Sequence, residues 1–112
     1  MSTVKGTIHA GVCGFVTTVT ASCEDGRNVT LDIQTDCPNL QCLSAALPPV
    51  IDCYAQLGGG YEGDFYQAAR TCLKGCCCGG CVVPPGLFKA MQVSAGVALP
   101  QTVSMEFVKT GD

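Results

Sequence analysis

The chain has little charge and few large aromatic side chains. Of its 112 residues, six are Lys or Arg, nine are Asp or Glu, one is His and none is Trp. The net charge is -3 at pH 7, and the basic residues are scattered along the sequence. This composition argues against the basic surface by which nucleic-acid-binding proteins hold phosphates. We therefore expect no nucleic-acid partner.

Long apolar runs are also missing. A membrane-spanning helix needs about twenty mostly apolar residues in succession, and the sequence has no such run, so we expect no membrane association. Residues 1–6 lack the basic head and apolar segment of a secretory signal, which predicts a cytoplasmic, reducing location. With 47% hydrophobic residues, the chain is expected to form one domain, residues 1–112, with its own core.

The cysteine content, in contrast, is high. The chain has ten cysteines, and four of them lie in the segment 76–81, Cys-Cys-Cys-Gly-Gly-Cys. An even number of cysteines is compatible with a disulfide scaffold. The expected reducing location and the apolar composition argue against it, and three successive cysteines do not readily find three separate disulfide partners. Clustered thiolates instead suit a soft metal or an iron-sulfur cluster.

Alternation of apolar and polar residues predicts strands at both ends of the chain. Val4, Gly6, Ile8 and Ala10 alternate with polar residues, as in a half-buried strand. Further strands are predicted over residues 15–23, 29–34 and 103–108, with a hairpin turn at 24–27.

The middle of the chain predicts helices, over residues 38–47, 50–57, 64–74 and 84–96. Pro38 suits a first helical position with Cys37 before it, and Asp64 is a suitable cap residue. We therefore expect an α+β fold. In it, a small antiparallel sheet (N-terminal strand, hairpin and C-terminal strand) is covered by about four helices.

Three cysteines stand where the backbone favours a bound thiolate. Cys13 lies between Gly11 and Gly14, which allow the backbone to approach a bulky group. Cys37 and Cys81 lie at or shortly before helix starts, whose positive end favours a thiolate. We expect the three to meet at one end of the sheet.

The order and spacing of these cysteines resemble a known family. Cys13-Gly14, the segment Thr35-Asp36-Cys37-Pro38 and then Cys81 are separated by intervals of 24 and 44 residues. Over residues 11–96 the chain is similar to the amino-terminal domain of the IscU/NifU iron-sulfur scaffold family. It also resembles a group of small, cysteine-rich, uncharacterised proteins of anaerobic bacteria and archaea. The resemblance implies a NifU/IscU-like fold and a cluster held by Cys13, Cys37 and Cys81.

Two positions depart from the scaffold family. Phe15 stands where the family has an Asp, and Gly80 stands where it has a His before the third cysteine. Both family residues are tied to cluster exchange. The departures favour a cluster held in place over a labile assembly platform.

The segment around residue 76 supplies further candidate ligands. Cys78 and Cys81 form a C-x-x-C pair, a spacing by which one loop holds a metal or cluster. Cys72 either binds metal or packs against its own helix. The remaining cysteines, Cys23, Cys42 and Cys53, are expected to pack in the core or beside the site. His9, on the polar face of the first strand, is expected to face water.

These features predict an iron-sulfur protein that is not an enzyme. It would serve as a cluster carrier or as an electron-transfer or redox accessory protein, with [4Fe-4S] favoured over [2Fe-2S]. The predicted partner is a client or donor redox protein, and a homodimer is physically reasonable. The candidate ligands are Cys13, Cys37, Cys72, Cys76, Cys77, Cys78 and Cys81.

Two alternatives stay open from the sequence. One is a zinc-binding structural or interaction module, although zinc sites favour two C-x-x-C pairs or Cys/His mixtures. The other is thiol-disulfide exchange by Cys78 and Cys81, although in such proteins the pair follows a core strand and opens a helix.

Overall fold

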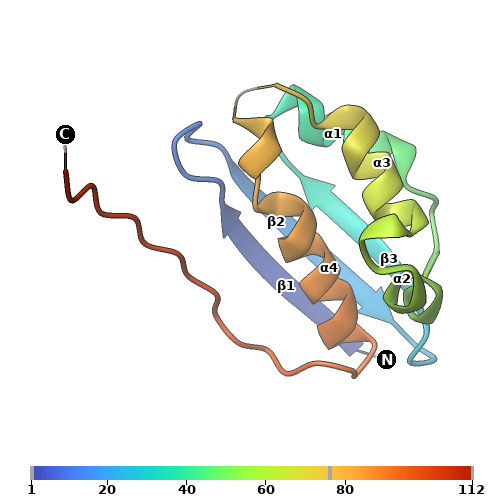
Figure 1. The fold of residues 1–112 in the computed structure, drawn as a ribbon. Helices are drawn as coiled ribbons and strands as arrows, with labels where there is room; N and C mark the ends of the chain where they lie inside the picture. The colour runs from blue at the N-terminus through green and yellow to red at the C-terminus, as the bar shows by residue number, and fades with distance from the viewer. Residues whose placement is uncertain (1, 76, 112) are drawn as a thin grey trace.

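The computed structural model describes residues 2–75 and 77–111, and within these residues a four-stranded antiparallel sheet forms one layer of the fold. Its strand order is β1-β2-β3-β4 (Figure 1). The strands are β1 (Ser2–His9), β2 (Val16–Cys23), β3 (Asn28–Gln34) and β4 (Ile51–Asp52). Each pair of neighbours is antiparallel; short loops join β1 to β2 and β2 to β3, whereas α1 lies in the connection between β3 and β4.

The carboxylate of Asp25 stabilises the β2–β3 turn. Asp25 accepts hydrogen bonds from the backbone N–H groups of Asn28 at 2.7 Å and Arg27 at 2.9 Å. Gly26 has a φ of 74°, a left-handed conformation that glycine adopts without steric cost. The hairpin predicted around residues 24–27 is therefore confirmed.

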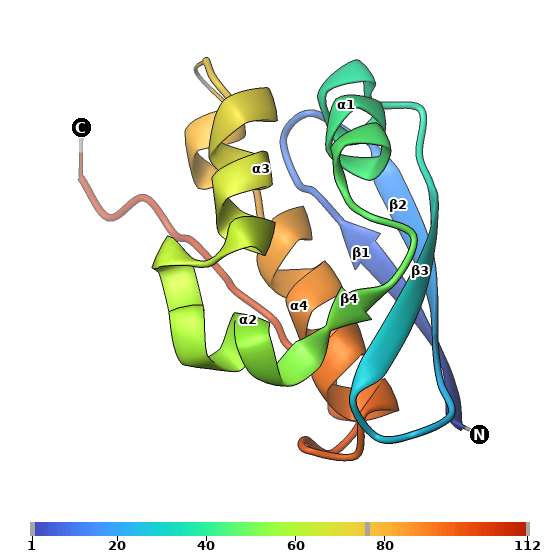
Figure 2. The same ribbon diagram turned by 90° about the vertical axis from the view of Figure 1, so that its right-hand side faces the viewer.

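The helices form a second layer on one face of the sheet (Figures 1 and 2). They are α1 (Pro38–Ala46), α2 (Cys53–Gly59), α3 (Asp64–Cys72) and α4 (Val83–Ser94). Two short 3-10 turns are η1 (Gly60–Glu62) and η2 (Cys78–Gly80). Helix α4 contacts β1 and β2, while α1 and α3 contact each other. The predicted α+β class is confirmed.

The core lies between the two layers. The inward side chains of β2 and β3, including Val19, Ala21 and Val29, are buried against the helices. The helices contribute the fully buried Leu40, Leu43, Phe65, Leu87 and Met91. Helix α4 packs tightly on β1 at Gly86, where an added Cβ would lie 2.6 Å from Ile8 Cδ1. The opposite face of the sheet is mostly polar and carries no helix among the described residues.

The predicted C-terminal strand over residues 103–108 is wrong. Residues 97–111, the tail, lie in no helix or strand, and nearly all of them are exposed. The fourth strand is β4 instead, which lies inside the helix predicted over residues 50–57. Ile51 pairs with Val29 and Asp52 with Asn28, and only then does α2 begin, with the Asp52 carboxylate accepting the N–H of Ala55.

In the described ranges, no helix combines the length and the apolar character needed to cross a membrane.

Candidate functional site

Three segments that are distant in the sequence meet at one end of the molecule. They are the β1–β2 loop, the start of α1 and the segment from η2 to the start of α4, all at the top of Figures 1 and 2. The β2–β3 turn lies at the opposite end. Each of the three segments carries a free cysteine: Cys13, Cys37, and Cys78 with Cys81.

The β1–β2 loop presents Cys13 to solvent from a tight turn. The N–H of Gly14 donates to the carbonyl of Gly11 at 2.9 Å, and the N–H of Ala10 donates to Phe15 at 3.1 Å. Gly11 and Gly14 have φ angles of 94° and 79°, which other residues rarely adopt. A Cβ at either position would meet nothing within 4 Å, so the space around Cys13 is open.

Cys37 is fixed at the start of α1 by two threonines. It is the residue before the first helical position, with extended backbone, and its N–H donates to Thr35 Oγ1 at 3.2 Å. Thr35 Oγ1 in turn accepts a hydrogen bond from the buried Thr17 Oγ1 at 3.0 Å. The helix start predicted from Pro38 is confirmed, and Cys37 is anchored to the sheet.

Sequence analysis missed these two threonines. A threonine two residues before a helix start is a recognisable turn signal, and it would have pointed to Thr35. No local signal identifies Thr17, because its contact with Thr35 exists only after β2 and β3 pair.

The segment after α3 folds into η2 and holds Cys78 near Cys81. The N–H of Cys81 donates to the carbonyl of Cys78 at 3.2 Å. The side-chain amide of Asn39 on α1 donates to Cys78 Sγ at 3.0 Å, which joins α1 to this loop. Asn39 was also missed, because its partner lies 39 residues away in the sequence.

The thiols are close enough to influence one another. Burial raises the pKa of the Cys81 thiol above its ordinary value, and a hydrogen bond from the N–H of Val83 opposes this effect. Electrostatic repulsion from the nearby Cys78, Cys13 and Cys37 raises the pKa of Cys81 further. A bound cation would relieve this repulsion at Cys81.

The loops that carry the cysteines are open to solvent. Among residues 2–75 and 77–111, no three side chains of His, Cys, Asp or Glu form a group that could hold a metal ion as they stand. A Cβ added to Gly79 or Gly80 would meet nothing within 4 Å. The arrangement thus has thiol donors and room between segments, but no ready-made site for a single ion.

The remaining predicted ligands are Cys72, Cys76 and Cys77. Cys77 is free and exposed at the start of η2, and the predicted ligand Cys76 lies outside the described residues. Cys72 is joined by a disulfide to Cys42, with Cα atoms 5.8 Å apart. The sulfur of Cys72 is therefore available to a metal only after that bond is reduced.

The disulfide corrects two sequence-based expectations. Cys42 was expected to pack in the core or beside the site, but it is exposed and bonded to Cys72. Sequence analysis argued against a disulfide scaffold, yet α1 and α3 contact each other and one cross-link joins them. Cys23 and Cys53 are buried in the core, as predicted, and His9 is exposed on β1, as predicted.

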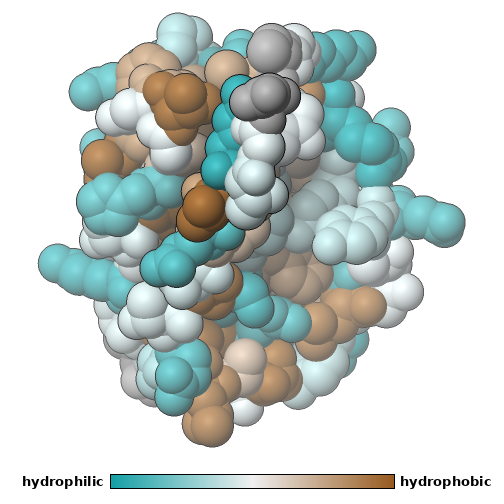
Figure 3. Space-filling view, turned by 60° about the vertical axis from the view of Figure 1, so that its left-hand side comes forward, coloured by the Kyte–Doolittle hydropathy of each residue, from teal (hydrophilic) through white to brown (hydrophobic). Residues whose placement is uncertain are grey.

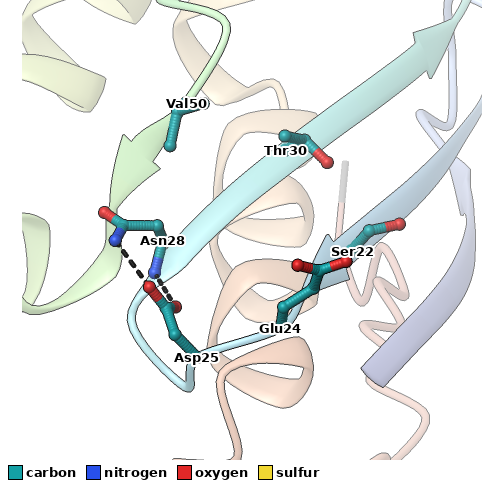
Figure 4. Close-up of a pocket in the computed structure, with 6 residues that line it drawn as sticks. All are labelled: Ser22, Glu24, Asp25, Asn28, Thr30 and Val50. Carbon is teal, nitrogen blue, oxygen red and sulfur yellow. Dashed lines mark hydrogen bonds between the residues drawn. The ribbon is translucent and has the colours of Figure 1, made fainter. Parts of the chain in front are cut away.

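A hollow lies at the opposite end of the sheet, and no cysteine lines it. Its lining residues are Ser22, Glu24, Asp25, Asn28, Thr30 and Val50 (Figure 4). The Asp25 carboxylate there is engaged by Asn28, whose side-chain amide donates to it at 2.7 Å. The Asp25 carboxylate in this hollow already has hydrogen-bond partners within the turn. We therefore keep the cysteine end as the candidate site.

The fold and the site together define a small, cysteine-rich α+β protein in which Cys13, Cys37, Cys77, Cys78 and Cys81 lie on segments at one end of the sheet, while the free Cys23 and Cys53 are buried in the core. The chain belongs to the family described as "Family of unknown function (DUF6951)", whose model matches residues 4–107. No curated protein and no solved structure matches the chain. The similarity to the IscU/NifU family therefore stays a prediction from the sequence.

Proposed function

We propose that this protein binds an iron-sulfur cluster through the thiolates of Cys13, Cys37, Cys78 and Cys81. In this role it acts as a cluster carrier or an electron-transfer protein for a client or donor redox protein in a reducing cytoplasm. The observation that supports the proposal best is the meeting of these four free cysteines, from three separate segments, at one end of the sheet.

The chemistry of the donor set fits such a group. Thiolates are the usual ligands of iron-sulfur clusters, and four of them match the ligand number of a [4Fe-4S] cluster. The glycines at positions 11, 14, 79 and 80 leave space next to the cysteines. When bound, a cluster of this kind accepts and releases single electrons.

The residues around the thiols supply orientation and charge compensation. The Asn39 amide donates to Cys78 Sγ, and the Val83 N–H donates to the Cys81 thiol. Such hydrogen bonds stabilise a charged sulfur and orient the ligand. Cys37 and Cys81 also lie close to the positive ends of α1 and α4, which favour negative charge.

The other candidate thiols of the segment are not ligands in this proposal. Cys77 is exposed in the same loop, and Cys72 becomes a thiol only if its bond to Cys42 is reduced. Cys76 stays a candidate from the sequence alone.

The test is the metal content of protein purified under strict anaerobiosis. We expect a brown protein with broad visible absorption and iron and acid-labile sulfide in similar amounts. Replacing Cys13, Cys37 or Cys81 singly by Ser is expected to remove the chromophore. The matched control is Cys77→Ser, which changes an exposed thiol of the same loop and is expected to keep the colour.

Three outcomes would contradict the proposal. A colourless protein with stoichiometric zinc would indicate the structural metal site considered above. A metal-free protein that reduces insulin disulfides would indicate thiol-disulfide exchange. Retained colour in all three Ser variants would show that the ligand assignment is wrong.

A further inference from the structure

Two segments of the described chain have backbone groups open to strand pairing. Strand β1 stands at the edge of the sheet, and within residues 2–75 and 77–111 its outer side pairs with no strand. The other segment is the tail, whose large apolar side chains are exposed. They include Leu99, Val103, Met105, Phe107 and Val108. An open strand edge and an exposed apolar segment both favour association.

The tail has the pattern and length of a strand. Val103, Met105 and Phe107 alternate with polar residues, as in a segment with one apolar and one polar face. Residues 102–108 would span about 23 Å as a strand, which is close to the length of β1. The family model extends to residue 107, so this part of the tail belongs to the region that family members share.

The faces and charges of the tail match those of β1. On β1, Val4 and Ile8 pack against the core, and the exposed Lys5 lies on the polar face. A tail strand with its apolar residues toward the helices would place Glu106 on the polar face with Lys5. Opposite charges on neighbouring strands are favourable. At the other side of the sheet, β4 pairs only with Asn28 and Val29, and the rest of β3 carries the exposed Asp32, which would repel Glu106.

The direction of the tail favours pairing with β1 of a second copy over pairing with β1 of its own chain. The tail leaves α4 and runs in the same direction as β1 (Figures 1 and 2), so pairing with its own β1 would be parallel. Every ladder in this sheet is antiparallel, and parallel sheets are usually covered on both faces. A copy related by a two-fold axis perpendicular to β1 presents its tail in the antiparallel direction. The tail-bearing side faces the viewer in Figure 3, where hydrophobic side chains are visible at the surface.

We propose that the tail of one copy adds as a fifth strand to the β1 edge of a second copy, and that the exchange is reciprocal. The product is a two-fold symmetric dimer in which each open β1 edge is covered. This inference requires no bound cluster and goes beyond the proposed function. It assigns residues 102–108 as the docking segment and β1 as the surface that receives it.

The first test is the molecular mass of the full-length, metal-free protein by light scattering and sedimentation. We expect a dimer for the wild type and a monomer for Met105→Pro, because proline removes a backbone N–H from the docking strand. The control Gln101→Pro lies before the docking segment and is expected to remain a dimer. Far-UV circular dichroism and thermal unfolding should show that both variants fold, since the tail is outside the core.

A charge exchange tests the register. Lys5→Glu and Glu106→Lys are each expected to weaken dimerisation several-fold, and the double variant is expected to recover it. In a mixture of isotope-labelled and unlabelled protein, contacts between β1 and residues 102–108 should be intermolecular.

Three results would overturn the proposal. One is a wild type that stays monomeric at all concentrations. Another is a dimer that survives Met105→Pro. The third is a monomer whose tail amides are protected from hydrogen exchange, since this would show that the tail pairs with its own chain.

Discussion

A single amide joins helix α1 to the cysteine loop. Asn39 Nδ2 lies 3.0 Å from Cys78 Sγ. Hydrogen bonds to ligand sulfurs are one of the factors that set the reduction potential of a cluster, because they stabilise its more negative, reduced form. If the proposed cluster is present, removing this donor should make reduction harder.

We therefore predict that Asn39→Leu shifts the reduction potential of the loaded protein to more negative values. The measurement is a redox titration followed by visible absorption or electron paramagnetic resonance. Gln34→Leu, which replaces an exposed amide on β3 bonded to Asp32, is the control and should leave the potential unchanged. Equal potentials in wild type and Asn39→Leu would mean that Asn39 does not contact a ligand.

The Asp25 carboxylate gives the β2–β3 turn a pH dependence. The N–H groups of Asn28 and Arg27 lower its pKa from 3.8 to about 2. Because the pKa is lower in the folded state, the contribution of Asp25 to stability is complete above pH 3.8 and is lost as the pH falls through about 2.

We predict that the stability difference between wild type and Asp25→Asn shrinks across this acidic range. Asparagine does not titrate, so only the wild type loses the contribution of an ionised carboxylate. Urea unfolding at a series of pH values measures the difference between the two midpoints. A constant difference down to pH 2 would show that the turn does not depend on the charge of residue 25.

At the scale of single residues, sequence analysis located cysteines of the candidate site but not the side chains that form hydrogen bonds around them. Cys13 and Cys37 were predicted from local signals, namely flanking glycines and a proline at a helix start, and both lie at the candidate site. Thr17 and Asn39 carry no such signal. Each acts through a residue distant in the sequence, so their roles become visible only when the chain is folded.

The disulfide between Cys42 and Cys72 connects elements α1 and α3. It closes a loop with a sequence separation of 30 residues. In the chain-entropy description, a cross-link of this length stabilises the folded state by about 3–4 kcal/mol, because it restricts the unfolded chain. That is a large part of the stability of a small domain, which is about 5–15 kcal/mol.

We predict that reduction of the metal-free wild type lowers its free energy of unfolding by about 3 kcal/mol. The double variant Cys42→Ser/Cys72→Ser should have this lower stability with or without reductant. Denaturant unfolding in the presence and absence of a dithiol measures both proteins. An unfolding midpoint of the wild type that does not respond to reductant would contradict a stabilising cross-link.

The elements also show where a local pattern misleads. Residues 103–108 alternate as a strand does, yet in the described chain they pair with nothing and remain exposed. Residues 51 and 52 have no strand pattern of their own, but Arg27 places them beside β3. Its carbonyl accepts the N–H of Cys53 at 2.9 Å, and its guanidinium Nε pairs with Asp52 at 3.1 Å. Alternation of apolar and polar residues shows that a segment is able to form a strand. Whether it forms one depends on a neighbouring strand to pair with.

At the scale of the whole molecule, the site depends on the fold as a unit. Cys13 precedes β2, Cys37 follows β3 and Cys81 precedes α4, so the segments that carry these thiols reach the same end of the molecule only when the sheet is formed and α4 lies on it. Antiparallel pairing of β1 with β2 and of β2 with β3 places the β1–β2 loop and the start of α1 at the same end. A group that binds these thiols together therefore recognises the folded state only.

We predict that loading the proposed cluster raises the free energy of unfolding of the entire chain. A ligand that binds only the folded state stabilises it by about 2.7 kcal/mol when present at about a hundredfold above its Kd. Thermal unfolding under anaerobic conditions compares loaded and metal-free protein. Cys77→Ser should retain the increase, whereas Cys13→Ser should lose it while its metal-free form stays as stable as the metal-free wild type, because Cys13 is exposed. If Cys13→Ser gained as much stability on loading as the wild type, the β1–β2 loop would not belong to the site.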